Sequence, residues 1–178
     1  RSVSRGLGDV YKRQILYYAE RLYQLPLALI GISIGTVILP YLASLNIRNQ
    51  KDKIIGLLST TFKIALSLII PAAFGLIFLS EIIVSVIYEY GIFGEYEVKE
   101  VSNVLVGFSF GLPAYVLIRI FSSVFYSMAD TKNPLKYSLI AIGINITLSV
   151  PLFVNFGVVG IAYATSLSAW VHLIIIFV

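Results

Sequence analysis

The stretch YYAERLYQLPLALIGISIGTVILP, Tyr17–Pro40, decides the fold class of this chain. From Leu25 onward it is apolar enough to lie in lipid, and it is long enough to cross a hydrocarbon core of about 30 Å as a helix. Its first turns nevertheless carry Glu20, Arg21 and Gln24. The stretch therefore predicts a transmembrane helix that begins with charged side chains, and that charge needs a physical reason.

The composition extends this prediction to the whole chain. Of the 178 residues, 58% are hydrophobic and only 12% are charged, whereas soluble domains carry about 25% charged residues. The apolar residues come in long runs without alternation, and a backbone in lipid must satisfy its own hydrogen bonds, so helices are expected rather than a β-barrel. We predict an all-α integral membrane protein with five transmembrane helices, at residues 16–45, 54–87, 101–128, 135–153 and 158–178.

The first fourteen residues, RSVSRGLGDVYKRQ, differ from the rest of the chain. They hold four of the thirteen basic residues and resemble a translated sequencing adapter. We interpret residues 1–14 as a non-native tail and residues 15–178 as the membrane domain. Without the tail, nine basic and eight acidic residues remain, so the net charge of +4 predicts no nucleic-acid partner. Because the last residues stop inside an apolar run, we expect the chain to be an internal fragment.

The charges of the connections predict the orientation. The first connection, residues 46–53, has three basic residues; the second, residues 88–100, has one; the third, residues 129–136, has two; the fourth has none. By the positive-inside rule, the first and third connections are cytoplasmic, and Tyr17 starts toward the outside.

Few residue types remain for chemistry. The chain has no cysteine and one histidine, which excludes disulfides and thiolate chemistry and leaves little for metal or acid–base sites. We predict no metal and no cofactor.

Charge inside the membrane carries most of the chemical information. On an α-helical wheel Arg21 and Gln24 share a face with Tyr17, Ala28, Gly31 and Gly35. This face is polar at the outer end and small toward the inner end, as in a cavity lining that grades into a helix contact. Arginine has a planar fork of donors that matches phosphate oxygens. Glu20 points about 100° away from Arg21 and need not pair with it. The alternative is an interfacial arginine that snorkels to the headgroups within a tyrosine belt.

Two further basic residues lie within predicted spans. Lys63 is nine residues into the second span, and Arg119 is nine residues before the end of the third, so both lie about 14 Å from the cytoplasmic ends of their helices. They are candidates for basic groups around a cavity open to the cytoplasm. Snorkelling with interhelical hydrogen bonding is the alternative.

Several stretches resemble the MurJ (MviN) family of lipid II flippases, within the multidrug/oligosaccharidyl-lipid/polysaccharide (MOP) exporter superfamily. The most specific are YYAERLYQLP and FYSMADTKNP, supported by PAAFGLIFLSEIIVSVIYEYGIF and GIAYATSLSAW. The family usually has aspartate at Glu20 and glycine at Ala129.

The resemblance implies a fold and a role. Complete members have about fourteen helices in two six-helix lobes and a C-terminal pair, and this chain is similar to helices eight to twelve, most of the second lobe. It implies a transporter rather than an enzyme, which moves lipid II across the bacterial cytoplasmic membrane by alternating access. The drive in the family is membrane potential or an ion gradient. The family's AxRL arginine, here Arg21, faces the central cavity and is implicated in binding the lipid pyrophosphate.

Partners and alternatives follow from the same resemblance. The expected partners are lipid II, membrane lipids, and the first lobe and C-terminal helices of the same protein. Another MOP transporter, for a polysaccharide lipid or a drug, is the nearest alternative. A membrane enzyme acting on polyprenyl lipids and a non-catalytic membrane scaffold are further alternatives.

Overall fold

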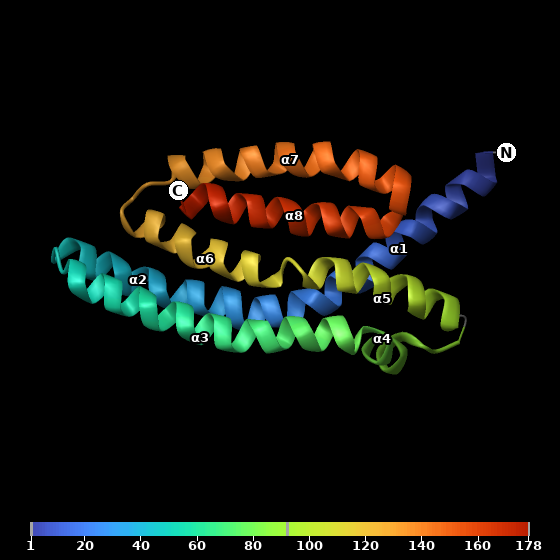
Figure 1. The fold of residues 1–178 in the computed structure, drawn as a ribbon, viewed down its shortest axis with the longest axis horizontal. Helices are drawn as coiled ribbons and strands as arrows, with labels where there is room; N and C mark the ends of the chain where they lie inside the picture. Colours follow the sequence, from blue (N-terminus) through green and yellow to red (C-terminus); the bar gives the residue numbers. More distant parts are fainter. Residues whose placement is uncertain (1, 92, 178) are drawn as a thin grey trace.

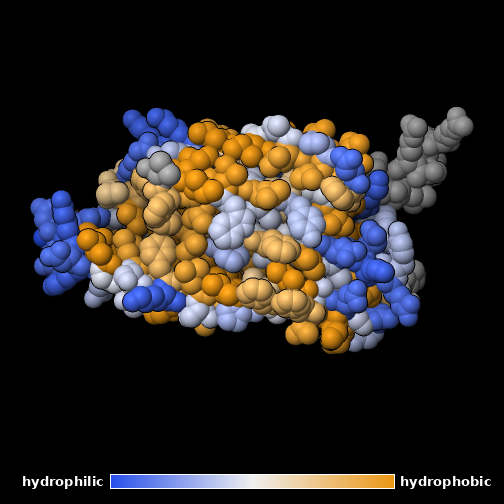
Figure 2. Space-filling view, in the orientation of Figure 1, coloured by the Kyte–Doolittle hydropathy of each residue, from blue (hydrophilic) through white to orange (hydrophobic). Residues whose placement is uncertain are grey.

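The computed structural model describes residues 2–91 and 93–177, nearly all of them helical. Five continuous helical stretches are long and apolar enough to cross a membrane, which confirms the predicted all-α membrane fold. The helices lie lengthwise along the molecule, and in the face that Figure 2 shows hydrophilic residues gather toward the two ends (Figures 1 and 2). The elements are α1 (Ser2–Pro26), the π-helix η1 (Leu27–Ile32), α2 (Ser33–Ile47), α3 (Lys51–Phe78), α4 (Ser80–Tyr88), α5 (Glu95–Ser109), α6 (Leu112–Ser127), α7 (Lys132–Phe156) and α8 (Val158–Phe177).

The first span is longer than predicted and is irregular in its middle. Helix α1 begins at Ser2 and continues through η1 into α2, so residues 2–14 follow a helical course into the span. The interpretation of this tail as non-native stays a prediction. The π-helix starts directly after Pro26, which has no N–H to donate to the preceding turn, and this missing hydrogen bond is a recognised cause of such irregularity.

The second and third spans also differ from the predicted ranges. The second is broken at Leu79, between α3 and the short α4. The third begins at Glu95 rather than at residue 101, so the acidic residues expected in a solvated connection form the first turns of α5. Carboxylates at a helix N-terminus are favourable because they face the positive end of the macrodipole. The backbone N–H of Gly94 also donates to Glu97 Oε2 at 3.0 Å.

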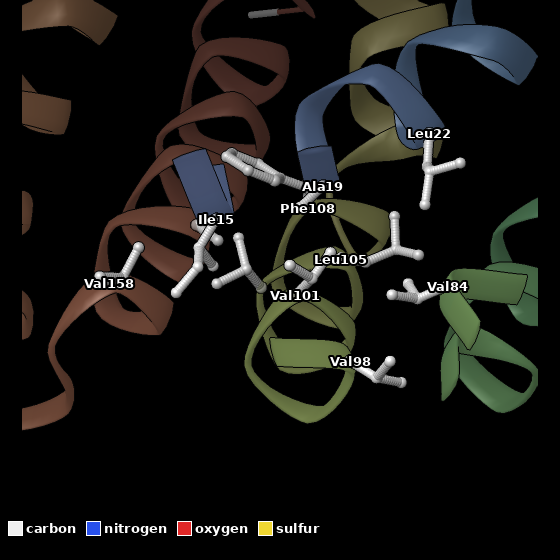
Figure 3. Packing of buried hydrophobic residues seen from close by; sticks show 11 residues of the cluster. Ile15, Ala19, Leu22, Val84, Val98, Val101, Leu105, Phe108 and Val158 are labelled. Carbon is white, nitrogen blue, oxygen red and sulfur yellow. The ribbon is translucent and has the colours of Figure 1, made fainter. Parts of the chain in front are cut away.

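The half of the bundle that contains α4 and α5 has its own apolar core. Helices α1, α4, α5 and α8 meet there around fully buried Val101 and Leu105 of α5, with Val84 of α4 and Ala19 of α1 (Figure 3). A second cluster, around Leu42, Ile69 and Ile120, joins α2, α3 and α6 in the other half. The third span thus lies at the centre of both clusters and organises the bundle.

The third span bends between α5 and α6. Pro113 has no N–H to offer the carbonyl of Ser109, and the N–H of Gly111 bonds to Phe108 O at 3.0 Å, leaving the carbonyl of Gly107 without it. Helix α8 supplies one donor to Gly107 and another to Phe110. Ser166 Oγ donates to Gly107 O at 2.6 Å, and Trp170 Nε1 donates to Phe110 O at 3.0 Å.

Glycine makes this contact with α8 possible. A Cβ at Gly107 would lie 2.8 Å from Ala162 Cβ, and one at Gly111 would lie 2.7 Å from Ser166 Oγ. Both distances are too short for an ordinary contact. The small-residue pair in the third span therefore allows α5 to approach α8 closely enough for Ser166 to reach the bend.

The connection from α6 to α7 is a structured turn. Ala129 has φ +58°, a left-handed conformation, at the position where the resembling family usually has glycine. Asp130 Oδ1 accepts the backbone N–H groups of Lys132 and Asn133 at 3.1 and 3.2 Å, so it caps α7. Asn46 Nδ2 donates to Ser127 Oγ at 2.7 Å, which ties this end of α6 to the end of α2. The two basic connections predicted to be cytoplasmic therefore lie at one end of the bundle (Figure 1).

The hydrogen bonds from α8 to the bend should contribute measurably to stability. In the full-length protein, Ser166→Ala and Trp170→Phe should each lower the free energy of unfolding by about 1 kcal/mol, because each leaves a carbonyl in the membrane without its donor. Thermal unfolding in detergent measures the effect. Thr165→Val is the matched control, since among the described residues the Thr165 hydroxyl bonds only to Ile161 O of its own helix. An equal loss in the control would contradict this account.

Ala129→Gly should stabilise the full-length protein by about 1 kcal/mol, because an alanine in the left-handed region carries a Cβ clash that glycine lacks. Ala72→Gly within α3 should have the opposite sign, since there glycine only adds unfolded-state freedom. Chemical or thermal unfolding of both variants compares them. A lower free energy of unfolding in Ala129→Gly than in wild type would contradict the claim that the left-handed conformation of Ala129 costs stability.

The cap at Asp130 should make stability depend on pH in acid. Its pKa is lowered from 3.8, chiefly because the backbone N–H of Asn133 donates to the carboxylate. A group with a lowered folded-state pKa stabilises above its ordinary value, and this contribution is lost as the pH falls through the folded value. The stability difference between wild type and Asp130→Ala should thus be constant from neutral pH to about pH 5 and shrink below about pH 4. A stability difference between wild type and Asp130→Ala that grows as the pH falls would contradict the proposed stabilisation of α7 by the Asp130 carboxylate.

Candidate functional site

The guanidinium of Arg21 lies on the exposed side of α1. Its Nη2 donates to Tyr17 Oη at 2.9 Å, and its central carbon lies 4.8 Å from the centroid of the same ring. Tyr17 is one helical turn earlier, so the pair is local to α1. The tyrosine therefore orients the arginine without neutralising it, since a phenol hydroxyl is uncharged at neutral pH.

The neighbouring acid is engaged elsewhere. Glu20 Oε1 accepts a hydrogen bond from Gln24 Nε2 at 2.9 Å, again across one helical turn. Among the described residues no carboxylate oxygen lies within 4.0 Å of the Arg21 guanidinium, as the 100° separation of adjacent helical positions predicts. The predicted site residues of α1 therefore form two separate pairs, Arg21 with Tyr17 and Glu20 with Gln24. Within the part of the chain that the structure covers, the positive charge of Arg21 remains uncompensated.

The other end of the predicted stripe behaves differently. Gly31 is buried against Val116 of α6, and a Cβ at Gly35 would lie 3.0 Å from Cγ of Arg119. The small end therefore packs against α6 while the polar end is exposed. This is the helix contact that the small end of the stripe predicted, and it forms although η1 has wider i→i+5 turns than an α-helix.

Arg119 opens on a cavity of about 520 Å³, which we name the Arg119 cavity. Residues of η1, α2, α6, α7 and α8 line it. Lys63, the other predicted basic candidate, does not line this cavity. It is exposed on α3, and Ala65 and Ile69 of the same helix are buried toward the bundle. The structure therefore does not gather Lys63 and Arg119 around one chamber.

Tyr23, which the sequence analysis did not propose as a site residue, packs between the helix that carries Arg21 and the span that carries Arg119. Tyr23 of α1 stacks on Phe108 at 4.8 Å and on Tyr115 at 6.1 Å between ring centroids. It thus contacts the third span on both sides of its bend. In the sequence, a tyrosine within an apolar helix indicates ordinary packing. The position of Tyr23 beside the bend of the third span is visible only in the structure.

Metal-binding groups are sparse in the structure. Within residues 2–91 and 93–177, no three histidine, cysteine, aspartate or glutamate side chains converge as metal ligands would. Apart from the Glu20 carboxylate, which accepts from Gln24, the polar side chains described above carry donors, namely guanidinium, amide and hydroxyl groups. Such groups suit the binding of an anion.

Comparisons with known proteins agree with this architecture. The family model described as "Lipid II flippase MurJ" matches residues 12–178. A Rickettsia prowazekii protein with the description "Probable lipid II flippase MurJ" is 38% identical over 159 residues, which cover 89% of this chain and 31% of that protein. A Rhizobium tropici protein with the same description is 37% identical over 163 residues, which cover 92% of this chain and 31% of that protein.

A solved structure, "Lipid II flippase MurJ, inward closed conformation", superimposes with a TM-score of 0.85 at 30% identity. The superposition covers 93% of this chain and 35% of that one. The chain spans about a third of the length of the relatives that it matches. With a family model covering nearly every residue, a resemblance that first rested on a few motifs is confirmed, and the chain belongs to the lipid II flippase MurJ family.

Proposed function

We propose that this chain supplies part of a lipid II flippase in the bacterial cytoplasmic membrane. One observation carries the proposal: the guanidinium of Arg21 is held by a neutral tyrosine while the adjacent carboxylate of Glu20 is taken up by Gln24. An uncompensated guanidinium on a membrane helix is expensive unless it faces water or an anion. The pyrophosphate of a lipid-linked precursor is an anion of the right kind.

In this mechanism, the Arg21 face meets the pyrophosphate in a hydrated chamber shared with the rest of the protein. The polyprenyl tail stays in lipid, and the lobes rock to expose the chamber to the other side. The π-helix after Pro26 and the bend before Pro113 are places where the first and third spans depart from a rigid rod. We propose membrane potential or an ion gradient as the drive.

The names of the relatives favour lipid II over other cargoes of the MOP superfamily. Each carries the words "lipid II flippase". They also favour transport over an enzymatic reaction on polyprenyl lipids, and over a scaffold in which the Arg21 face packs dry.

Substitutions at Arg21 test the proposal in the full-length protein. Arg21→Ala should lower lipid II translocation in proteoliposomes about tenfold to a hundredfold, because charge-assisted hydrogen bonds to phosphate are lost. The translocation rate of Arg21→Lys should lie between those of wild type and Arg21→Ala, because lysine keeps the charge but lacks the bidentate fork of arginine. Arg48→Ala, in the exposed connection after α2, is the matched arginine control and should leave translocation unchanged.

Full activity in both Arg21 variants would leave only the snorkelling interpretation. Equal losses in Arg21→Ala and Arg48→Ala would show a general effect of arginine removal on assembly.

A further inference from the structure

Tyr17 has a hydrogen-bonding capacity that its contact with Arg21 does not use. In that hydrogen bond the guanidinium is the donor and the phenol oxygen is the acceptor, so the proton of the hydroxyl is still available. Among the described residues, no group accepts this proton. The Tyr17 side chain is 51% exposed, so burial in a core does not explain its position. Tyr17 and Arg21 therefore present two donor groups side by side on one exposed face of α1.

The ring of Tyr17 is connected to a packed part of the bundle. It meets Tyr18 edge to face, with ring centroids 6.0 Å apart. Tyr18 in turn packs on Tyr88 of α4, at 4.8 Å between centroids, and on Phe93 of the connection to α5, at 5.6 Å. These last three side chains are partly buried against the apolar core around Val101. With the guanidinium of Arg21 against the same ring, these contacts restrict the orientation of Tyr17 before any ligand arrives.

The hydrogen bond also changes what the hydroxyl can do. A hydroxyl that accepts from a cation becomes a stronger donor, because hydrogen bonds in a chain polarise one another. The two donor atoms, Arg21 Nη2 and Tyr17 Oη, are 2.9 Å apart. That spacing suits two oxygens of one phosphate group, or one oxygen from each of two linked phosphates. Since both side chains are already oriented, a ligand that binds them loses less of its binding energy to ordering them.

We propose that Tyr17 is a second substrate-binding residue, whose hydroxyl donates to the same phosphate group that Arg21 binds. The proposal rests on the proposed function and deepens it, because it turns a tyrosine of the outer face into a direct contact of the head group. It also gives the pair a selectivity. A head group with one acceptor atom at this point leaves one of the two donors without a partner, whereas a phosphate satisfies both.

The test compares removal of the hydroxyl with removal of the ring in the full-length protein. Lipid II translocation is measured in proteoliposomes at a series of lipid II concentrations, so that KM and the maximal rate are separated. Tyr17→Phe keeps the ring and its contacts but loses the hydroxyl, and it should raise KM about tenfold. Tyr17→Leu also loses the ring and should impair translocation further. Tyr41→Phe, at an exposed tyrosine of α2, is the matched control and should leave KM unchanged.

A double-mutant cycle with Arg21→Ala tests whether the two residues act together. In the Arg21→Ala background Tyr17→Phe should change KM less than twofold, because the hydroxyl has lost the group that orients and polarises it. A tenfold effect in both backgrounds would show an independent contact and overturn the pair.

The outcomes also separate this proposal from the function on which it rests. Wild-type KM in Tyr17→Phe with impaired translocation in Tyr17→Leu would show that the ring only orients Arg21, which overturns the direct contact and leaves the proposed role of Arg21 in place. Equal effects of Tyr17→Phe and Tyr41→Phe would likewise overturn the direct contact. Normal translocation in Arg21→Ala would refute the proposed function, and this proposal with it.

Discussion

The structure depends on a single constraint: within a membrane, each polar group must find its partner inside the protein. The bend between α5 and α6 shows this most clearly. Pro113 and Gly111 interrupt the hydrogen-bond ladder of the third span, and Ser166 and Trp170 of α8 donate to carbonyls on the two sides of the interruption. Because the third span belongs to both apolar clusters, the partner helix that satisfies the bend also fixes the arrangement of the bundle.

The charged groups obey the same constraint in a different way. Glu20 is satisfied by Gln24, and Arg21 is oriented by Tyr17, but the positive charges of Arg21 and Arg119 find no counter-charge in the described residues. Groups that the fold leaves uncompensated are the ones available to a ligand.

Much of this could be predicted from the sequence, and the misses have physical causes. The five spans were evident from hydropathy because lipid solvation acts on each segment independently. The extension of α5 back to Glu95 was missed because charged residues read as a connection, although carboxylates are favourable in a first helical turn. The inner, small end of the face from Tyr17 to Gly35 was predicted to form a helix contact, and Gly31 and Gly35 do pack against α6, but the sequence did not show that the π-helix η1 interrupts the span.

The sequence by itself determined the membrane class, the number of spans, the family and the presence of arginine within apolar helices, because each of these is a property of a local segment. Only the tertiary structure decided which arginine meets a cavity, that Lys63 stands apart from it, and that Glu20 pairs with Gln24 rather than Arg21. Those outcomes depend on the relative rotation and depth of helices, which are set by close contacts such as Gly35 with Arg119 and Gly107 with Ala162. No single segment contains that information.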